Sequence, residues 1–63
     1  MSDFMLQNSG SISVLTPLTQ QAAKWIDDHI DPNAQSWGGG VVIEHRYVDD
    51  IVDGIERDGF SII

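Results

Sequence analysis

Cysteine is absent from this 63-residue chain, and basic residues are scarce, with only three lysines and arginines. Without cysteine there is neither a disulfide framework nor a thiolate metal site. Because small secreted domains usually depend on such cross-links, we expect an intracellular, cytoplasmic protein. With so few cations the chain is not expected to bind DNA, RNA or anionic lipid directly, since phosphate recognition needs clustered Lys and Arg.

Long apolar runs are also missing. The longest fully aliphatic run is Val41-Val42-Ile43, far short of the roughly 20 residues that cross a bilayer. Met1 to Gly10 lacks a basic start and a long apolar stretch, so we do not expect a signal peptide. A chain of this length forms one domain at most, with a thin core. A flat or convex binding surface is therefore easier to build than a catalytic cleft.

Acidic residues dominate the charge. Ten Asp and Glu give a formal net charge of −7. Such a charge points to a basic partner, or only to solubility, because small domains commonly carry about 2–8 net charges. Both interpretations remain open from the sequence.

The first eleven residues are predicted to form a flexible tail, because the segment from Gln7 to Ser11 is polar and contains a glycine. Phe4, Met5 and Leu6 are apolar, so docking of these three residues on the domain stays open. Residues 12–63 are then a single folded domain. Within it, Ile12 to Thr16 alternates apolar and polar side chains, which predicts a short strand.

A first helix is predicted from about Pro17 to Ile30, with Thr16 as its N-terminal cap and the proline in its first turn. The pair Asp31-Pro32 should end it, because the residue before proline is pushed out of the helical region. One face of this helix carries Thr19, Ala22, Ala23, Ile26 and Ile30, flanked by Leu18 and Trp25.

The second half of the chain predicts a strand over 41–44, a helix over 45–58 that Gly59 terminates, and a final strand over 60–63. The helix has an apolar stripe at helical spacing, formed by Val48, Ile51, Val52 and Ile55. The order is thus β-α-β-α-β. We expect an α+β fold with a three-stranded sheet and two helices on one face, or an α/β fold if the long second crossover joins parallel strands.

No catalytic or metal site is predicted. The run Gly38 to Gly40 precedes a strand and lacks a lysine, so it is a turn or a close backbone approach and not a phosphate loop. A calcium loop starting at Asp49 would lack two ligands, at Ile51 and Phe60. No Ser, His and Asp arrangement specifies a triad. We therefore expect a protein without enzymatic activity, metal or cofactor.

The acidic side chains are the candidate binding residues. Asp49, Asp53 and Glu56 form a ridge on the second helix, and Asp50 points straight outward. A second group closes the first helix, where it opposes the helix dipole: Asp27, Asp28 and Asp31. Trp37 is either a core residue or an exposed interface anchor.

The stretch from Trp37 to Ile55, WGGGVVIEHRYVDDIVDGI, resembles small uncharacterised proteins of bacterial phages and mobile elements. In size and charge the chain is similar to phage-encoded inhibitors of host defence, including anti-CRISPR and anti-restriction proteins. The resemblance implies an inhibitor that occupies the basic nucleic-acid channel of a host complex, such as a CRISPR effector, by imitating DNA. The alternative is a structural or regulatory interaction module, which could form a homodimer through Trp37 and the edge strand at 60–63.

Overall fold

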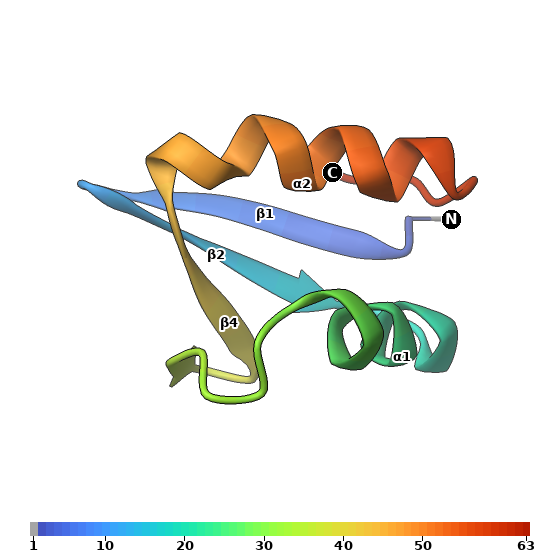
Figure 1. Ribbon diagram of the computed structural model, residues 1–63, viewed down its shortest axis with the longest axis horizontal. Helices are drawn as coiled ribbons and strands as arrows, with labels where there is room; N and C mark the ends of the chain where they lie inside the picture. The colour runs from blue at the N-terminus through green and yellow to red at the C-terminus, as the bar shows by residue number, and fades with distance from the viewer. Residues whose placement is uncertain (1) are drawn as a thin grey trace.

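The computed structural model describes residues 2–63, apart from the side chain of Trp37. Its three longer strands and a two-residue strand form one sheet in the order β1-β2-β4-β3, with every neighbouring pair antiparallel. The α+β class is confirmed, and the predicted order β-α-β-α-β is wrong (Figure 1). The elements are β1 (Phe4–Ser9), β2 (Ile12–Pro17), α1 (Gln20–His29), β3 (Ser36–Trp37), β4 (Gly40–Glu44) and α2 (His45–Arg57).

The predicted N-terminal tail is instead the strand β1. It pairs with β2 over its whole length, from Phe4 opposite Pro17 to Ser9 opposite Ile12. Phe4 is fully buried, and its ring meets the rings of Trp25 and Phe60 edge-on at 5.9 and 5.8 Å. The first residues therefore belong to the core, because a strand needs only its inward side chains to be apolar.

Glycines shape the two hairpins of the sheet. Gly10 has φ +71° and stands first in the two-residue turn between β1 and β2, as a type II′ turn requires. Gly38 and Gly39 have φ +60° and +85°, which suits the type I′ turn between β3 and β4. Gly40 is a close approach, because an added Cβ would lie 2.7 Å from Thr16 Oγ1. Both expectations for this glycine run, a turn and a close backbone approach, are confirmed.

Helix α1 begins later than predicted. Strand β2 continues through Pro17, and Thr19 caps the helix, its hydroxyl accepting a hydrogen bond from the Ala22 N–H at 3.0 Å. The helix ends at His29, close to the predicted stop. Helix α2 spans His45–Arg57 as predicted, and Gly59 follows it with φ +88°.

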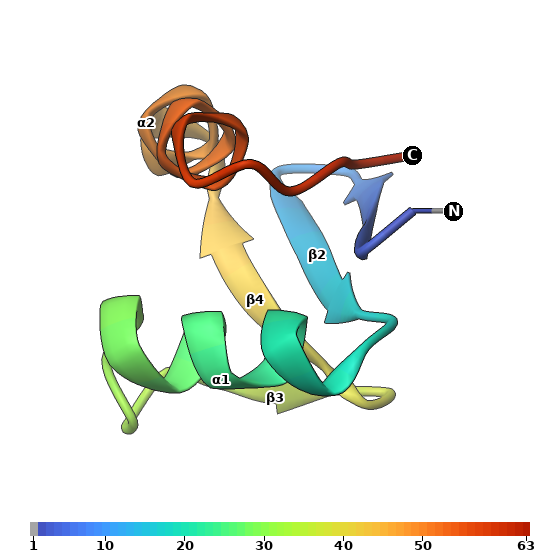
Figure 2. The ribbon, with the colours of Figure 1, turned by 90° about the vertical axis from the view of Figure 1, so that its right-hand side faces the viewer.

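Both helices cover the same face of the sheet, where their side chains and those of β1, β2 and β4 form a single core. Figure 2 shows α1 running across the view while α2 is seen nearly end-on, so the helices lie crosswise. The largest fully buried side chains of the core come from three different elements: Phe4, Leu15 and Ile55. Among residues 2–63, no helix is both long and apolar enough to cross a bilayer.

The segment after α2 pairs over fewer residues than the predicted strand at 60–63. It makes one parallel bridge, between Ile62 and Phe4, and so lies beside β1 at the far edge from β4. Its backbone bonds to β1 include Ile63 N–H to the Phe4 carbonyl and Leu6 N–H to the Ile63 carbonyl, both at 3.0 Å. The connection through α2 therefore links β4 to a final segment that runs in the same direction. In the sheet, β2 and β1 lie between the two.

The burial of Phe4 gives a direct test of the N-terminal strand. Phe4→Ala should lower the free energy of unfolding by about 3–5 kcal/mol, because it empties a fully buried site. Gln7→Ala, at an exposed position of the same strand, should change it by less than about 0.5 kcal/mol. Urea denaturation followed by circular dichroism measures both, and equal small effects would show that β1 contributes nothing to the core.

Two glycines should respond in opposite ways to alanine. Gly40→Ala should destabilise by about 1–3 kcal/mol, because the new Cβ would lie 2.8 Å from the Leu15 carbonyl oxygen. Gly54→Ala should be neutral or should stabilise by up to about 1 kcal/mol, because it lies in α2 and its Cβ would meet the Trp25 ring at 3.4 Å. Thermal unfolding of the two variants measures both changes in stability. A loss of stability in Gly54→Ala equal to that in Gly40→Ala would contradict this packing.

Candidate functional site

The acidic ridge of α2 lies on one flank of the helix. Ile55 is fully buried, and Val48, Ile51 and Val52 are half-buried, so the predicted apolar stripe faces the core. Successive residues turn by about 100° around a helix. The ridge residues Asp49, Asp53 and Glu56 therefore project to one side of that stripe, and all three are exposed.

These carboxylates have no partners in the described part of the chain. Across residues 2–63, no ion pair or hydrogen bond engages any side chain of the group formed by Asp49, Asp50, Asp53 and Glu56. Asp49 and Asp53 are also like charges one helical turn apart, which costs a helix about 0.2–0.5 kcal/mol. Nothing in the packing of α2 requires these four acids.

The basic residues of α2 do not neutralise the ridge. Arg46 pairs with Glu44 at 3.0 Å, and its guanidinium lies 4.9 Å from the centre of the Tyr47 ring. Arg46 and Asp50, and Asp53 and Arg57, are each four positions apart on the helix, but neither pair forms an ion pair among the described residues. The outer surface of α2 therefore keeps its excess of negative charge.

The acids of α1 lie apart from this ridge. Gly54 and Asp58 face α1, because the first meets the Trp25 ring and the second accepts its N–H. The ridge lies on the other flank of α2, so the structure does not bring it together with Asp27 and Asp28, which are exposed on α1. Asp31 has a local role, since its Oδ1 accepts a hydrogen bond from the Asn33 N–H at 2.9 Å.

Trp37, the remaining predicted binding residue, has a side chain outside the described part of the structure. Its backbone belongs to β3, opposite Gly40. Trp25, in contrast, is a core residue with 7% of its surface exposed. Gly54 packs against it, since a Cβ added at Gly54 would lie 3.4 Å from the Trp25 ring.

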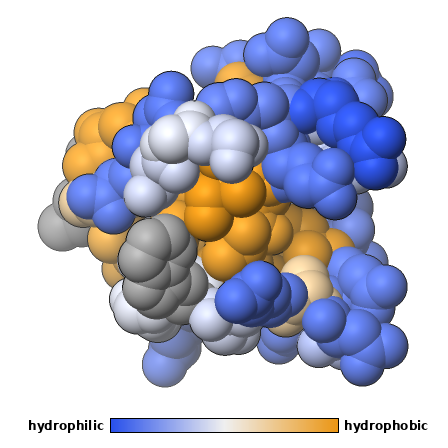
Figure 3. Space-filling model, turned by 90° about the vertical axis from the view of Figure 1, so that its left-hand side faces the viewer, coloured by the Kyte–Doolittle hydropathy of each residue, from blue (hydrophilic) through white to orange (hydrophobic). Residues whose placement is uncertain are grey.

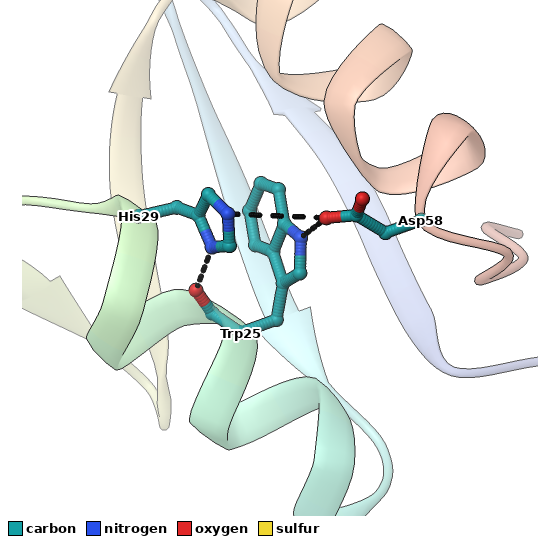
Figure 4. Close-up of polar contacts among 3 residues, drawn as sticks. All are labelled: Trp25, His29 and Asp58. Carbon is teal, nitrogen blue, oxygen red and sulfur yellow. Dashed lines mark hydrogen bonds and ion pairs between the residues drawn. The ribbon is translucent and has the colours of Figure 1, made fainter.

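A polar cluster that the sequence did not reveal joins the ends of the two helices (Figure 4). The indole N–H of Trp25 donates to Asp58 Oδ2 at 2.7 Å, and the His29 ring stacks on the indole with 4.2 Å between ring centres. His29 Nε2 lies 3.8 Å from the same carboxylate oxygen. The cluster connects residues 33 positions apart, and no local pattern marks such a pair.

The contacts of His29 fix its tautomer. Its Nδ1 lies 2.9 Å from the Trp25 carbonyl oxygen, which can only accept, so Nδ1 carries a proton. A neutral ring would then turn the bare lone pair of Nε2 toward Asp58, whereas the imidazolium would place an N–H there. His29 lies in the last turn of α1, and its contacts in this cluster give it a structural role.

Metal chemistry has no donor set in the described residues. Among residues 2–63, no three His, Asp or Glu side chains gather closely enough to hold an ion. His45 and Asp49, four positions apart at the start of α2, are both exposed and lie beside a shallow hollow against Leu6 and Ser13.

The fold and its surface define a small α+β protein that presents uncompensated carboxylates on one exposed helix. Comparison with family models, curated proteins and solved structures found no match to this chain.

The cluster in Figure 4 predicts that Asp58 contributes to stability mainly through Trp25. Asp58→Ala should cost about 1 kcal/mol, because it leaves a nearly buried indole N–H without an acceptor. His29→Gln should cost less, since the His29 and Asp58 side chains are 49% and 46% exposed and water screens their pairing.

Asp53→Ala is the control, because that residue is exposed and unpaired. Its free energy of unfolding in urea should match that of the unchanged protein within about 0.5 kcal/mol. If Asp58→Ala were no more destabilising than this control, the hydrogen bond to Trp25 would contribute nothing.

Proposed function

We propose that this protein is a binding protein without catalytic activity, and that the exposed flank of α2 docks on a basic protein surface. In the specific form of this proposal, the basic surface belongs to a host defence complex, such as a CRISPR effector. The bound protein then excludes nucleic acid from that surface. The cytoplasm of a bacterial host is where such a partner would be met.

One observation carries this proposal. Four carboxylates on α2 have no partner in the described structure. Their positions are exposed, so lysine or arginine would fit at them equally well. Surface charges that stabilise a fold are normally paired with opposite charges, and among residues 2–63 neither Arg46 nor Arg57 forms an ion pair with these four acids. A basic partner would supply the missing opposite charges.

The spacing of these carboxylates supports imitation of nucleic acid. Asp49 and Glu56 are seven residues apart, which is about 10 Å along a helix that rises about 1.5 Å per residue. Four acids over that length give one charge for about every 3.5 Å. A nucleic-acid strand carries one charge for about every 3.4 Å of duplex axis. A channel built for phosphates would therefore meet a similar linear charge density.

A matched pair of variants tests whether position or total charge matters. Asp49→Asn with Asp53→Asn removes two charges from the ridge, and Asp27→Asn with Asp28→Asn removes two from α1. The ridge variant should weaken retention of nucleic-acid-binding proteins from a nuclease-treated bacterial lysate by about tenfold, at about 0.2–1 kcal/mol for each exposed contact. The α1 variant should leave retention nearly unchanged.

Competition distinguishes mimicry from simple charge attraction. Captured proteins, identified by mass spectrometry, should be released by duplex DNA and by salt of about 0.5 M, which shortens electrostatic range to a few ångströms. DNA-binding assays with purified CRISPR effectors then test the specific form. Equal losses in both charge variants, or capture that ignores salt, would contradict the ridge as a docking surface.

The alternative is an interaction module that pairs with a second copy through residues 61–63. These residues lie outermost in the sheet beside β1, and Ile63 is 62% exposed. Exposed strand edges favour such pairing. Because each copy carries −7, we expect the protein to remain a monomer in sedimentation at low salt. A dimer that Ile62→Pro abolishes would instead establish this alternative.

A further inference from the structure

A groove of about 620 Å³ lies at β4, in the corner between the end of α1 and the first half of α2. Its apolar lining includes Ile30 at the end of α1, Ile43 of β4 and Ile51 of α2. Trp25 joins α1 to the residues at the other end of α2, and the two helices lie crosswise (Figure 2). The corner beside the first half of α2 is therefore left unfilled.

The apolar lining of this groove is accessible from outside. Figure 3, drawn from the side on which the start of α2 lies, shows an apolar hollow surrounded by polar surface. Ile30 and Ile51 are only half-buried, and Tyr47, which borders the groove, is 48% exposed. An accessible apolar recess beside a large, rigid aromatic ring is typical of the centre of a protein interface.

Strand β4 offers no free edge to an incoming chain. β3 and the residue before it, Gln35, already cover this edge over residues 40–42. Ile43 pairs with β2, and Glu44 is the N-terminal cap of α2. An extended segment that entered the groove would therefore lose hydrogen bonds from its backbone to water without gaining replacements from the sheet.

A helix meets this constraint, because its backbone hydrogen bonds are formed within the segment itself. An amphipathic helix binds an apolar groove by inserting side chains at positions i, i+3 or i+4, and i+7, while its polar face stays in water. Here the isoleucines that receive such side chains come from three different elements, and the Tyr47 ring stands at the border. The absence of a free strand edge thus favours a helix as the occupant.

The charge around the groove favours a basic helix. Asp31 and Glu44 line the groove, and no lysine or arginine is among the described residues that do. Arg46 lies nearby and pairs with Glu44, but both side chains are largely exposed, so this pair is weak and can be exchanged. Lysine or arginine beside the apolar face of the helix would complement these carboxylates.

A second copy of this chain does not have the helix that the groove requires. Both helices already use their apolar faces in their own core, where Ala22 and Ile26 of α1 and Ile55 of α2 are buried. Each copy also carries a net charge of −7, which opposes self-association. The occupant is therefore a segment of a different protein.

We propose that the groove at β4 binds an amphipathic helix of a partner protein, with lysine or arginine on both sides of its apolar face. The apolar side chains of that helix contact Ile30, Ile43 and Ile51, and one of them packs against the Tyr47 ring. Its basic side chains lie beside the two carboxylates that line the groove.

This inference goes beyond the function proposed above, because the acidic ridge lies on the other flank of α2. Both surfaces can be occupied at the same time. Failure of either binding event leaves the other standing.

The test is a titration of the isotope-labelled protein, at about 0.15 M salt, with a synthetic peptide of about 16 residues. The peptide carries leucine at helical spacing and lysine on both sides of that stripe. Amide signals of Ala34, Tyr47 and Ile51 should shift, and those of Asp53 and Glu56 should not. Circular dichroism of the mixture should exceed the sum of the separate spectra, because a free helix of this length is only marginally stable.

Two control peptides separate the helical form from the charge. Proline in the middle of the polar face should weaken binding at least about tenfold, because it breaks the helix and leaves every leucine and lysine in place. Glutamate in place of each lysine should weaken binding by a similar factor, because it faces the carboxylates of the groove.

Variants place the binding on the protein. Ala34→Arg puts a long cationic side chain into the groove, and Tyr47→Ala removes the ring at its border; each should weaken binding of the lysine peptide about tenfold or more. Because Tyr47 is half-exposed, its removal should leave the circular dichroism of the protein unchanged. Asp49→Asn with Asp53→Asn is the control and should bind the peptide nearly as before.

Several outcomes would overturn the proposal. Absence of shifts at the groove would exclude a helix site there, and equal binding of the proline peptide would exclude a helical occupant. Equal binding of the glutamate peptide would exclude charge selection. Shifts confined to Asp49, Asp53 and Glu56 would assign the peptide to the ridge, and groove shifts on concentrating the protein alone would assign the groove to a second copy.

Discussion

The indole of Trp25 is the contact on which the arrangement of the elements depends. Its ring meets Phe4 of β1 edge-on, lies against Gly54 of α2 and is covered by the stacked ring of His29. Its N–H is bound by Asp58 directly after α2. One side chain of α1 thus fixes the distance between the two helices and the position of the first strand. In a chain this short, few other side chains are large enough to do so.

Helix α2 has a separate surface on each flank because α1 and the sheet occupy its inner side. Gly54 lies against Trp25, and the side chains before it on the same flank, such as Tyr47, border the groove at β4. The other flank turns away from α1 and carries only exposed acids and the exposed His45. A single helix therefore separates an apolar recess from a row of uncompensated charge.

Local patterns predicted the parts of the fold that depend on local chemistry. The stripe from Val48 to Ile55 predicted α2 correctly, and the alternation after Ile12 predicted β2. The strand β1 was missed because its second half, from Gln7 to Ser9, is polar, although two strand-like runs separated by Gly10-Ser11 are a hairpin signal. The cap at Thr19 was assigned to Thr16 because Pro17 suits a first helical turn as well as a strand end.

The same distinction between local and long-range features applies to the candidate site. The exposure of the ridge followed from helical periodicity alone, whereas the Trp25–Asp58 bond and the groove at β4 depend on contacts between distant segments that no spacing encodes. The parallel pairing of the last segment with β1 was equally invisible. It requires residues 58 positions apart to meet, such as Asp3 and Ser61.

That meeting of distant segments has a consequence for how the protein is made. Phe4 emerges from the ribosome early, yet the residues that enclose it include Phe60 near the other end of the sequence. At a synthesis rate of about 5–20 residues per second, the aromatic ring stays uncovered for several seconds. The β1–β2 hairpin can form in that interval, and Trp25 of α1 can already meet its inner face, but Ile55 and Phe60 join only after α2 and the segment beyond it have been translated. The core is thus completed late, and part of the apolar surface of the nascent chain stays open to chaperones until then.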